Sequence, residues 1–286
     1  MPAPRPPVSA RPTRLSVTRI ETLMRDPYSI YARYILGLKV LDPLEADPGA
    51  AERGTFIHQA LERFVAGYAS GALPPEARDA LIKEGEAAFG PVLGRPAVRA
   101  FWWPRFERIA DWFLREEAKR RGALDQAFVE QTGKAGVPVA DIRFTVQATA
   151  DRIDRMADGS YVIMDYKTGA PPSKKDVKSG KAPQMPLEAM ILAEGGFAAI
   201  GPGAVSELQY WRLSGGSPAG KITPVDEDVA AIVAEVRDGL IALIEGFMRP
   251  ETPYLPTPRS ALKMRFNDYD HLSRKAEWSA GGEGDA

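Results

Sequence analysis

The 286-residue chain contains no cysteine and only two histidines. The absence of cysteine excludes disulfides, thiolate zinc sites and iron–sulfur clusters held by cysteine. No apolar stretch approaches the roughly 18 residues that a membrane-spanning helix needs, and the Pro- and Arg-rich start lacks the apolar segment of a signal peptide. A net charge of −1 excludes a global basic field, so binding of nucleic acid would have to come from local patches. We therefore expect a cytoplasmic protein with no membrane partner.

Composition and periodicity divide the chain into an arm, one large domain and a tail. Residues 1–14 are rich in proline and arginine, which predicts a flexible linker or arm. Residues 15–255 are predicted to form a single domain, with a helical lobe over about 15–122 and a core of strands and helices over about 123–250. Residues 256–286 form a tail that ends in a low-complexity run.

Apolar spacing predicts the individual elements. Helices are expected over 16–23, 28–36, 54–65, 75–121, 184–192 and 228–248. Strands are expected near 127–131, 138–149, 160–166 and 206–213, with Gly133 and Gly136 separating the first two. The lysine-rich residues 172–182 are predicted to form a loop.

The segment that ends in Asp165-Tyr166-Lys167 is the most informative part of the sequence. A short apolar run, 161–164, follows an Asp-Gly turn and predicts a buried strand entered through a hairpin. Because side chains alternate along a strand, Asp165 and Lys167 point to the same side. A charged pair at the end of a buried strand is costly unless it is paired. A divalent metal held by Asp165 and by Asp151, on the other arm of the hairpin, would meet that cost and would indicate a phosphodiesterase.

Each of these features also has a purely structural interpretation. Asp165 and Lys167 could form an ordinary salt bridge, and His58 could be a histidine at the edge of the core instead of a metal ligand. Two further acid-x-lysine triplets, ending at Lys119 and Lys178, lie in a helix and in the polar stretch, where the geometry does not support a metal site.

Other candidate sites are weaker. The segment Gly215–Lys221 matches a phosphate-binding loop, but residue 222 is isoleucine and its flanks predict a hairpin, so we exclude a nucleotide site. The aromatic residues between 101 and 113 are expected in the core, the alternative being a platform on which bases stack. A group of lysines could be a solvated loop or could hold backbone phosphates: Lys174, Lys175, Lys178 and Lys181.

Four motifs occur in an order that resembles the RecB-type branch of the PD-(D/E)XK nucleases: Gly54-x-x-x-His58, Ala150-Asp151-Arg152-Ile153-Asp154, Asp165-Tyr166-Lys167-Thr168-Gly169 and Gln184. The resemblance is greatest to the C-terminal nuclease domain of AddB, a subunit of the AddAB helicase–nuclease that processes double-strand breaks. It implies an α/β, restriction-endonuclease-like fold, a mixed β-sheet flanked by helices, with an N-terminal helical lobe.

The resemblance also implies roles for individual residues. His58, Asp151, Asp165 and the carbonyl of Tyr166 would hold Mg²⁺ or Mn²⁺, with Asp151, Asp165 and Lys167 catalytic. Gln184 would contact DNA, and an AddA-like helicase–nuclease subunit would be the partner.

The chain departs from the family pattern at three positions. Glu188 stands where the family has tyrosine, Ala148 replaces a usual glycine, and Asp26 replaces the first cysteine of an iron–sulfur cluster. We therefore expect no such cluster and expect packing to tie the N-terminal helices to the tail. The predicted function is a metal-dependent DNA exonuclease in double-strand break repair and recombination; the alternative is a nuclease-like DNA-binding module that has lost activity.

Overall fold

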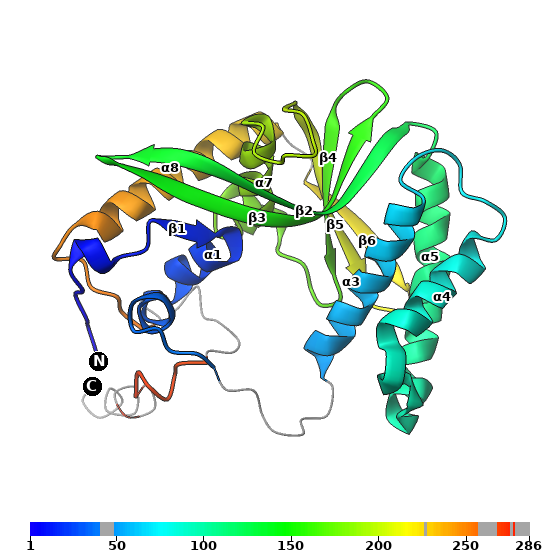
Figure 1. The fold of residues 1–286 in the computed structure, drawn as a ribbon, viewed down its shortest axis with the longest axis horizontal. Coiled ribbons are helices and arrows are strands. Elements are labelled where there is room, and N and C mark those ends of the chain that lie inside the picture. Colours follow the sequence, from blue (N-terminus) through cyan, green and yellow to red (C-terminus); the bar gives the residue numbers. More distant parts are fainter. Residues whose placement is uncertain (41–48, 226–227, 257–267, 275–276, 278–286) are drawn as a thin grey trace.

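The protein has a mixed six-stranded sheet with helices on both sides, which confirms the predicted fold class (Figure 1). The structure is a computed structural model that describes residues 1–40, 49–225, 228–256, 268–274 and 277. Its strands are β1 (Arg14–Ser16), β2 (Leu124–Val139), β3 (Ile142–Met156), β4 (Tyr161–Lys167), β5 (Val205–Leu213) and β6 (Gly220–Val225).

The α-helices lie mostly where the apolar spacing predicts them. They are α1 (Val17–Arg25), α2 (Pro27–Ile30), α3 (Ala50–Gly67), α4 (Ala77–Phe89), α5 (Trp103–Arg120), α6 (Lys174–Lys178), α7 (Gln184–Ala193) and α8 (Val229–Met248). Ser16 caps α1 and Asp228 caps α8, since each side chain accepts a hydrogen bond from the backbone three residues on.

The sheet contains a fork between β3 and β4. These strands pair antiparallel only from Arg152 opposite Met164 to Arg155 opposite Tyr161. Beyond Arg152, β3 leaves β4 and continues with β2, while β1 pairs in parallel with β3 at 145–147. Strand β4 continues in parallel with β5 as far as Lys167. Asp151 and Asp165 are therefore the first residues of the two branches beyond the point where β3 and β4 stop pairing.

Two hydrophobic cores cover the two faces of the sheet. The first packs α1, α7 and α8 against β1 and the long β2–β3 ribbon, through residues such as Leu15, Val146 and Leu187. The second packs α3, α4 and α5 against β4–β6, through residues such as Phe64 and Trp211. The predicted aromatic group contributes buried Phe106, Trp112 and Phe113 to this second core, although Phe101 is exposed.

The predicted break in the first strand is wrong. Strand β2 runs through Gly133 and Gly136, and the chain turns only after Val139. Gly133 is needed because its Cα faces the ring of Phe197, where a Cβ would lie 2.5 Å from Cδ1. The glycines thus allow close packing across the strand instead of ending it.

The predicted loop at 172–182 contains the short helix α6. Ser173 caps it by accepting a hydrogen bond from the backbone of Asp176, and its own hydroxyl donates to the Asp176 carboxylate. The hairpin predicted around residues 215–221 is confirmed, since β5 and β6 pair antiparallel up to Leu213 opposite Gly220.

Several of the first 14 residues, predicted as an arm, contact the segment that follows α8. The buried guanidinium of Arg11 donates hydrogen bonds to four backbone carbonyls, those of Pro6, Phe247, Arg249 and Pro250. Proline content alone does not reveal such contacts, because each acceptor is a backbone group. The domain boundaries themselves stay a prediction.

Packing joins the N-terminal helices to the described part of the tail, as expected. Tyr269 packs with Tyr28 and Ala32, and its hydroxyl donates to the carbonyl of Leu38 at 2.9 Å. Most of the predicted tail, 256–286, lies outside the described residues.

A buried ion network joins the helical lobe to the sheet. The guanidinium of Arg152 on β3 donates twice to Glu117 on α5, at 2.8 Å, and twice to Asp154, at 2.7 and 2.9 Å. Arg121 and Arg120 complete the network by contacting Glu117 and Asp154. Burial raises the pKa of Glu117, but the arginine charges outweigh this and leave that pKa below its ordinary value.

Replacing Arg152 should therefore destabilise the fold strongly. Arg152→Ala leaves Glu117 and Asp154 buried without their shared partner, and breaking such a pair costs about 3–5 kcal/mol. Arg155→Ala is the matched control, because Arg155 pairs with the exposed Asp125 and should lose less than about 1 kcal/mol. Urea denaturation measures both variants, and equal losses would contradict a special role of the buried network.

Candidate functional site

The fork brings together the charged residues that the sequence singled out. The backbone N–H of Tyr166 donates to Asp151 Oδ2 at 2.8 Å, which links the two branches. Lys167 Nζ lies 2.7 Å from both oxygens of Asp165. The ammonium and carboxylate thus point to one side of β4, as the strand alternation predicts.

His58 reaches the fork from the helical lobe. Its Nδ1 lies 3.6 Å from Asp151 Oδ2, and its ring meets Tyr166 edge-on. Burial alone would lower the pKa of His58, but the Asp151 and Asp165 carboxylates outweigh it and raise that pKa. Helix α3 can approach this closely because residue 54 is a glycine without a side chain. A Cβ at this position would lie 3.2 Å from Thr168 Oγ1, which is tighter than most Cβ contacts.

Gln184 and Glu188 reach the fork from the opposite helical layer. Gln184 Nε2 donates to Asp165 Oδ1 at 2.9 Å and to Glu188 Oε1 at 3.2 Å. Glu188 is 1% exposed, and its Oε2 has no hydrogen-bond partner among the described residues. Burial first, and then the charge of Asp165, raise the pKa of Glu188 well above its ordinary value. A carboxylate therefore occupies the position where the resemblance leads one to expect a tyrosine.

The two aspartates of the fork differ in their electrostatics. Burial opposes the charge of Asp151, but the neighbouring His58 and the Tyr166 N–H lower its pKa below the ordinary value. Burial raises the pKa of Asp165 to about 6, since Lys167 offsets the burial only in part. Asp165 is therefore less readily ionised than Asp151.

Glu130 joins the site although the sequence did not single it out. Among the described residues, His58, Glu130 and Asp151 can place one ligand atom each within 4.8 Å of one another. Glu130 lies between Val129 and Gln131, which pair with Arg152 and Ala150 on either side of Asp151, and it has a positive φ of 48°. Burial and the nearby Asp151 raise its pKa to about 7. No local pattern marks this residue, because its role depends on the pairing of two strands.

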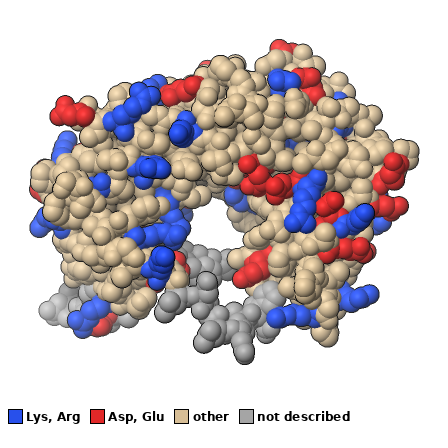
Figure 2. Space-filling model, in the orientation of Figure 1, with Lys and Arg blue, Asp and Glu red and all other residues tan. Residues whose placement is uncertain are grey.

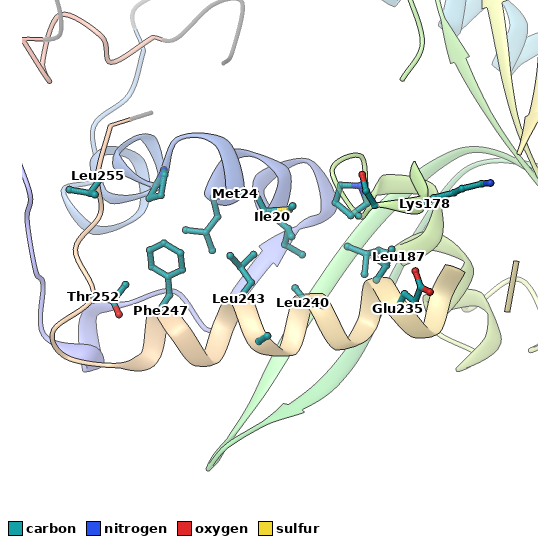
Figure 3. Close-up of a pocket in the computed structure, with 18 of the residues that line it drawn as sticks. Ile20, Met24, Lys178, Leu187, Glu235, Leu240, Leu243, Phe247, Thr252 and Leu255 are labelled. Carbon is teal, nitrogen blue, oxygen red and sulfur yellow. The ribbon is translucent and has the colours of Figure 1, made fainter. Parts of the chain in front are cut away.

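A cleft of about 540 Å³ opens beside these side chains, lined by residues that include His58, Glu62, Glu130 and Lys167. Figure 2 shows the molecule hollowed between the N-terminal helices and the helical lobe, with mainly blue cations on the first side and red acids interspersed with blue cations on the second. A larger cavity of about 660 Å³ lies elsewhere, between α1 and α8 (Figure 3). Side chains such as Met24, Leu243 and Phe247 point into it, so its walls are mainly apolar and lack the chemistry of the fork.

The loop lysines do not line the cleft at His58. Lys174, Lys175 and Lys178 belong to α6, and Lys181 follows it, between the end of β4 and the start of α7. The two other acid-x-lysine triplets have structural roles: Glu117 belongs to the buried ion network, and Asp176 contacts the cap of α6.

The side chains at the fork fit a divalent metal. Carboxylate oxygens are the ligands of Mg²⁺ and Mn²⁺, and an imidazole suits Mn²⁺ as well. Within the described part of the chain, Asp165 Oδ2 and Glu188 Oε2 are buried oxygens without a hydrogen-bond donor of good geometry, so the site offers more carboxyl oxygens than its donors satisfy. A cation would offset this excess.

Comparison with known proteins agrees with this geometry. The family model described as the PD-(D/E)XK nuclease superfamily matches residues 14–261. An uncharacterized protein of Rickettsia bellii is 26% identical over 91% of this chain and 32% of its own length, and one of Rickettsia felis is 33% identical over 65% of this chain and 22% of its own. A subunit of an ATP-dependent helicase/deoxyribonuclease from Streptococcus agalactiae is 26% identical over 61% of this chain and 16% of its own length.

The chain thus spans about a third or less of the length of these relatives. The solved structure of SSO0001 covers 81% of this chain, but with 13% identity and a TM-score of 0.33 the likeness is too weak to support a conclusion. In the described part of the chain, no helix combines the length and apolar character that crossing a membrane requires.

The raised pKa of Asp165 predicts a pH-dependent gain in stability when its charge is removed. A folded pKa of about 6 against an ordinary 3.8 means that the folded state binds the proton more tightly, so this group's contribution to stability falls as pH rises between these values. At about 1.36 kcal/mol per pKa unit the penalty above pH 6 is about 3 kcal/mol. Metal-free Asp165→Asn should therefore melt higher than the parent at pH 7.5, and the gap should close near pH 4. A gap independent of pH would contradict this assignment.

Proposed function

The chain belongs to the PD-(D/E)XK nuclease superfamily, and from this premise we propose that it is a metal-dependent nuclease that hydrolyses DNA phosphodiester bonds. The single observation that supports this most is the fork, where Asp151, Asp165 and Lys167 meet His58 at the end of a buried strand. A structural salt bridge between Asp165 and Lys167 alone would not require the carboxylate of Asp151 and the imidazole of His58 beside it.

The proposed roles follow from position and charge. Asp151, Asp165, His58 and the carbonyl of Tyr166 would hold Mg²⁺ or Mn²⁺, with Glu130 within reach of the same cation. A bound divalent ion polarises a phosphoryl oxygen and lowers the pKa of its water. The Lys167 ammonium, held against Asp165, would stabilise the negative charge that develops on the phosphate. Gln184 would keep Asp165 oriented through the hydrogen bond that joins them.

A more specific role is supported by the relatives. We propose that the chain acts as the exonuclease part of an AddB-like subunit in double-strand break repair and recombination, with an AddA-like helicase–nuclease subunit as partner. The Streptococcus agalactiae relative is named as a subunit of a helicase/deoxyribonuclease. The alternative, a DNA-binding module without activity, predicts the same DNA binding with no cleavage, so a nuclease assay with and without Mg²⁺ separates the two.

Loss of either charged residue of the motif should abolish cleavage. Asp165→Ala removes charge that would hold the metal and Lys167→Ala removes charge that would stabilise the transition state, and each should lower the rate by about 10²–10³ or more. Asp176→Ala is the matched control, because Asp176 belongs to the same kind of triplet but only contacts the cap of α6. Labelled DNA with Mg²⁺ gives the rates, and near-normal cleavage by either fork variant contradicts the assignment.

Mg²⁺ should raise the melting temperature through the same carboxylates. A ligand that binds only the folded state stabilises it by RT ln(1 + [L]/Kd). The rise should shrink in His58→Ala and vanish when Asp151 and Asp165 are both replaced by Asn, which keeps their shape and removes their charge. A rise that survives the double substitution would place the metal elsewhere.

The lysines on and after α6 should add to DNA binding if they hold phosphates. Each phosphate contact contributes about −0.7 to the slope of log K against log salt for a single strand. Replacing all four lysines by Ala should therefore flatten the slope by up to about 3 in fluorescence anisotropy. The four lysines are Lys174, Lys175, Lys178 and Lys181. An unchanged slope would show that they only form a solvated surface.

A further inference from the structure

The outer half of the β2–β3 ribbon has one buried and one exposed face. On β3, the residues Phe144, Val146 and Ala148 are buried in the core under α7 and α8, and the intervening residues are exposed or half-buried. Strand β2 alternates in the same way. The exposed face carries polar and basic side chains instead of apolar ones, so it is not an apolar surface that lacks a covering element. We name this face the basic strip; its residues are Arg14, Ser16, Thr132, Lys134, Arg143, Thr145, Gln147 and Thr149.

Three cations of the strip gather around one hollow. Arg14 on β1, Lys134 on β2 and Arg143 on β3 line a depression of about 420 Å³, together with Thr145 and Gln147 and, among the described residues, with no acidic side chain. Within the same described ranges, none of the three cations forms an ion pair with a carboxylate. A depression lined by cations without a carboxylate partner attracts anions, because charge of one sign raises the local concentration of its counter-ions.

The strip leads directly to the fork. Arg14 lies opposite Thr145 and Lys134 opposite Gln147, so the strands hold these residues in one register. Closer to the fork, Thr132 and Thr149 hydrogen bond to each other at 3.0 Å. The next residue of this row on β3 is Asp151. From Arg143 to Asp151 is eight residues, or about 26 Å at about 3.3 Å per residue.

We infer that the basic strip binds the sugar–phosphate backbone of one DNA strand and leads it to the carboxylates of the fork. The strip presents cations, hydroxyls and an amide, which are the groups that contact phosphate and sugar. Its length of about 26 Å is enough to contact several successive phosphates of one DNA strand. It contains no aromatic side chain to stack on bases, so the contacts are independent of sequence. This inference rests on the proposed nuclease function and adds the path of its substrate.

The test compares two triple variants with the same change in net charge. Arg14→Ala, Lys134→Ala and Arg143→Ala together remove the cations of the strip. The control variant removes three exposed lysines of the helical lobe and of β6: Lys83, Lys119 and Lys221. Binding of a fluorescein-labelled oligothymidine strand is measured by anisotropy in EDTA at several salt concentrations.

The strip variant should lose about 2 from the slope of log K against log salt, at about −0.7 per contact, and the control should keep the parent's slope. An equal loss in both variants would show a general charge effect and overturn the inference. A parent that cleaves DNA while the strip variant keeps its slope overturns the strip and leaves the nuclease proposal intact. A parent that binds through the strip but never cleaves contradicts the nuclease proposal and supports the strip.

The cysteine-free sequence offers a second measurement that does not depend on affinity. Gln147→Cys places a single thiol in the strip, and Glu86→Cys places one on the exposed surface of α4. After both thiols are labelled with the same photoactivatable crosslinker, only the Gln147→Cys protein should crosslink to the oligothymidine strand. Crosslinking from Glu86→Cys alone, or equally from both, would place the strand elsewhere.

Discussion

The buried guanidinium of Arg152 is the contact on which the arrangement of the site depends. It bridges Glu117 of α5 and Asp154 of β3, and it is the residue directly after Asp151. Burying three charges gives little net stability by itself, because desolvation offsets most of the attraction. The three side chains come from α5 and β3, however, so the network joins the helical lobe to the sheet directly beside Asp151. His58 belongs to this lobe, and its distance from Asp151 therefore depends on the network.

The fork then concentrates negative charge that the protein leaves only partly balanced. Strand pairing stops between Asp151 and Asp165, so neither carboxylate is enclosed by a continuous ladder, and both helical layers can reach them. Burial raises the pKa values of Asp165 and Glu188, and Lys167 and Gln184 offset this only in part. Such an excess lowers the stability of the folded protein. A site that binds a divalent cation needs this excess, since a fully neutralised cluster would have no affinity for one.

The sequence predicts the parts of this site that depend on local geometry. Asp165 and Lys167 are two residues apart on one strand, and Asp151 lies on the other arm of a short hairpin, so alternation and turn chemistry suffice to group them. Glu130 could not be predicted, because its approach to Asp151 depends on the register of a long strand pair and on a left-handed residue within it. The role of Gly133 was likewise hidden, since the ring of Phe197 that requires it lies 64 residues further along the chain.

Strand β3 takes part in the core, in the exposed polar face and in the fork. Its alternate residues contribute to the core beneath α7 and α8 and to the exposed polar face, and it carries Asp151 and Arg152 at the point where it leaves β4. Its register is set three times: by β2 along its whole length, by β1 near Thr145, and by the buried ion network. A DNA strand bound along the exposed face of β3 would therefore contact a rigid surface whose side chains have a fixed spacing. The phosphate that reaches Asp151 would then be selected by contacts several phosphates away, which is how a sequence-independent surface can still position one bond for cleavage.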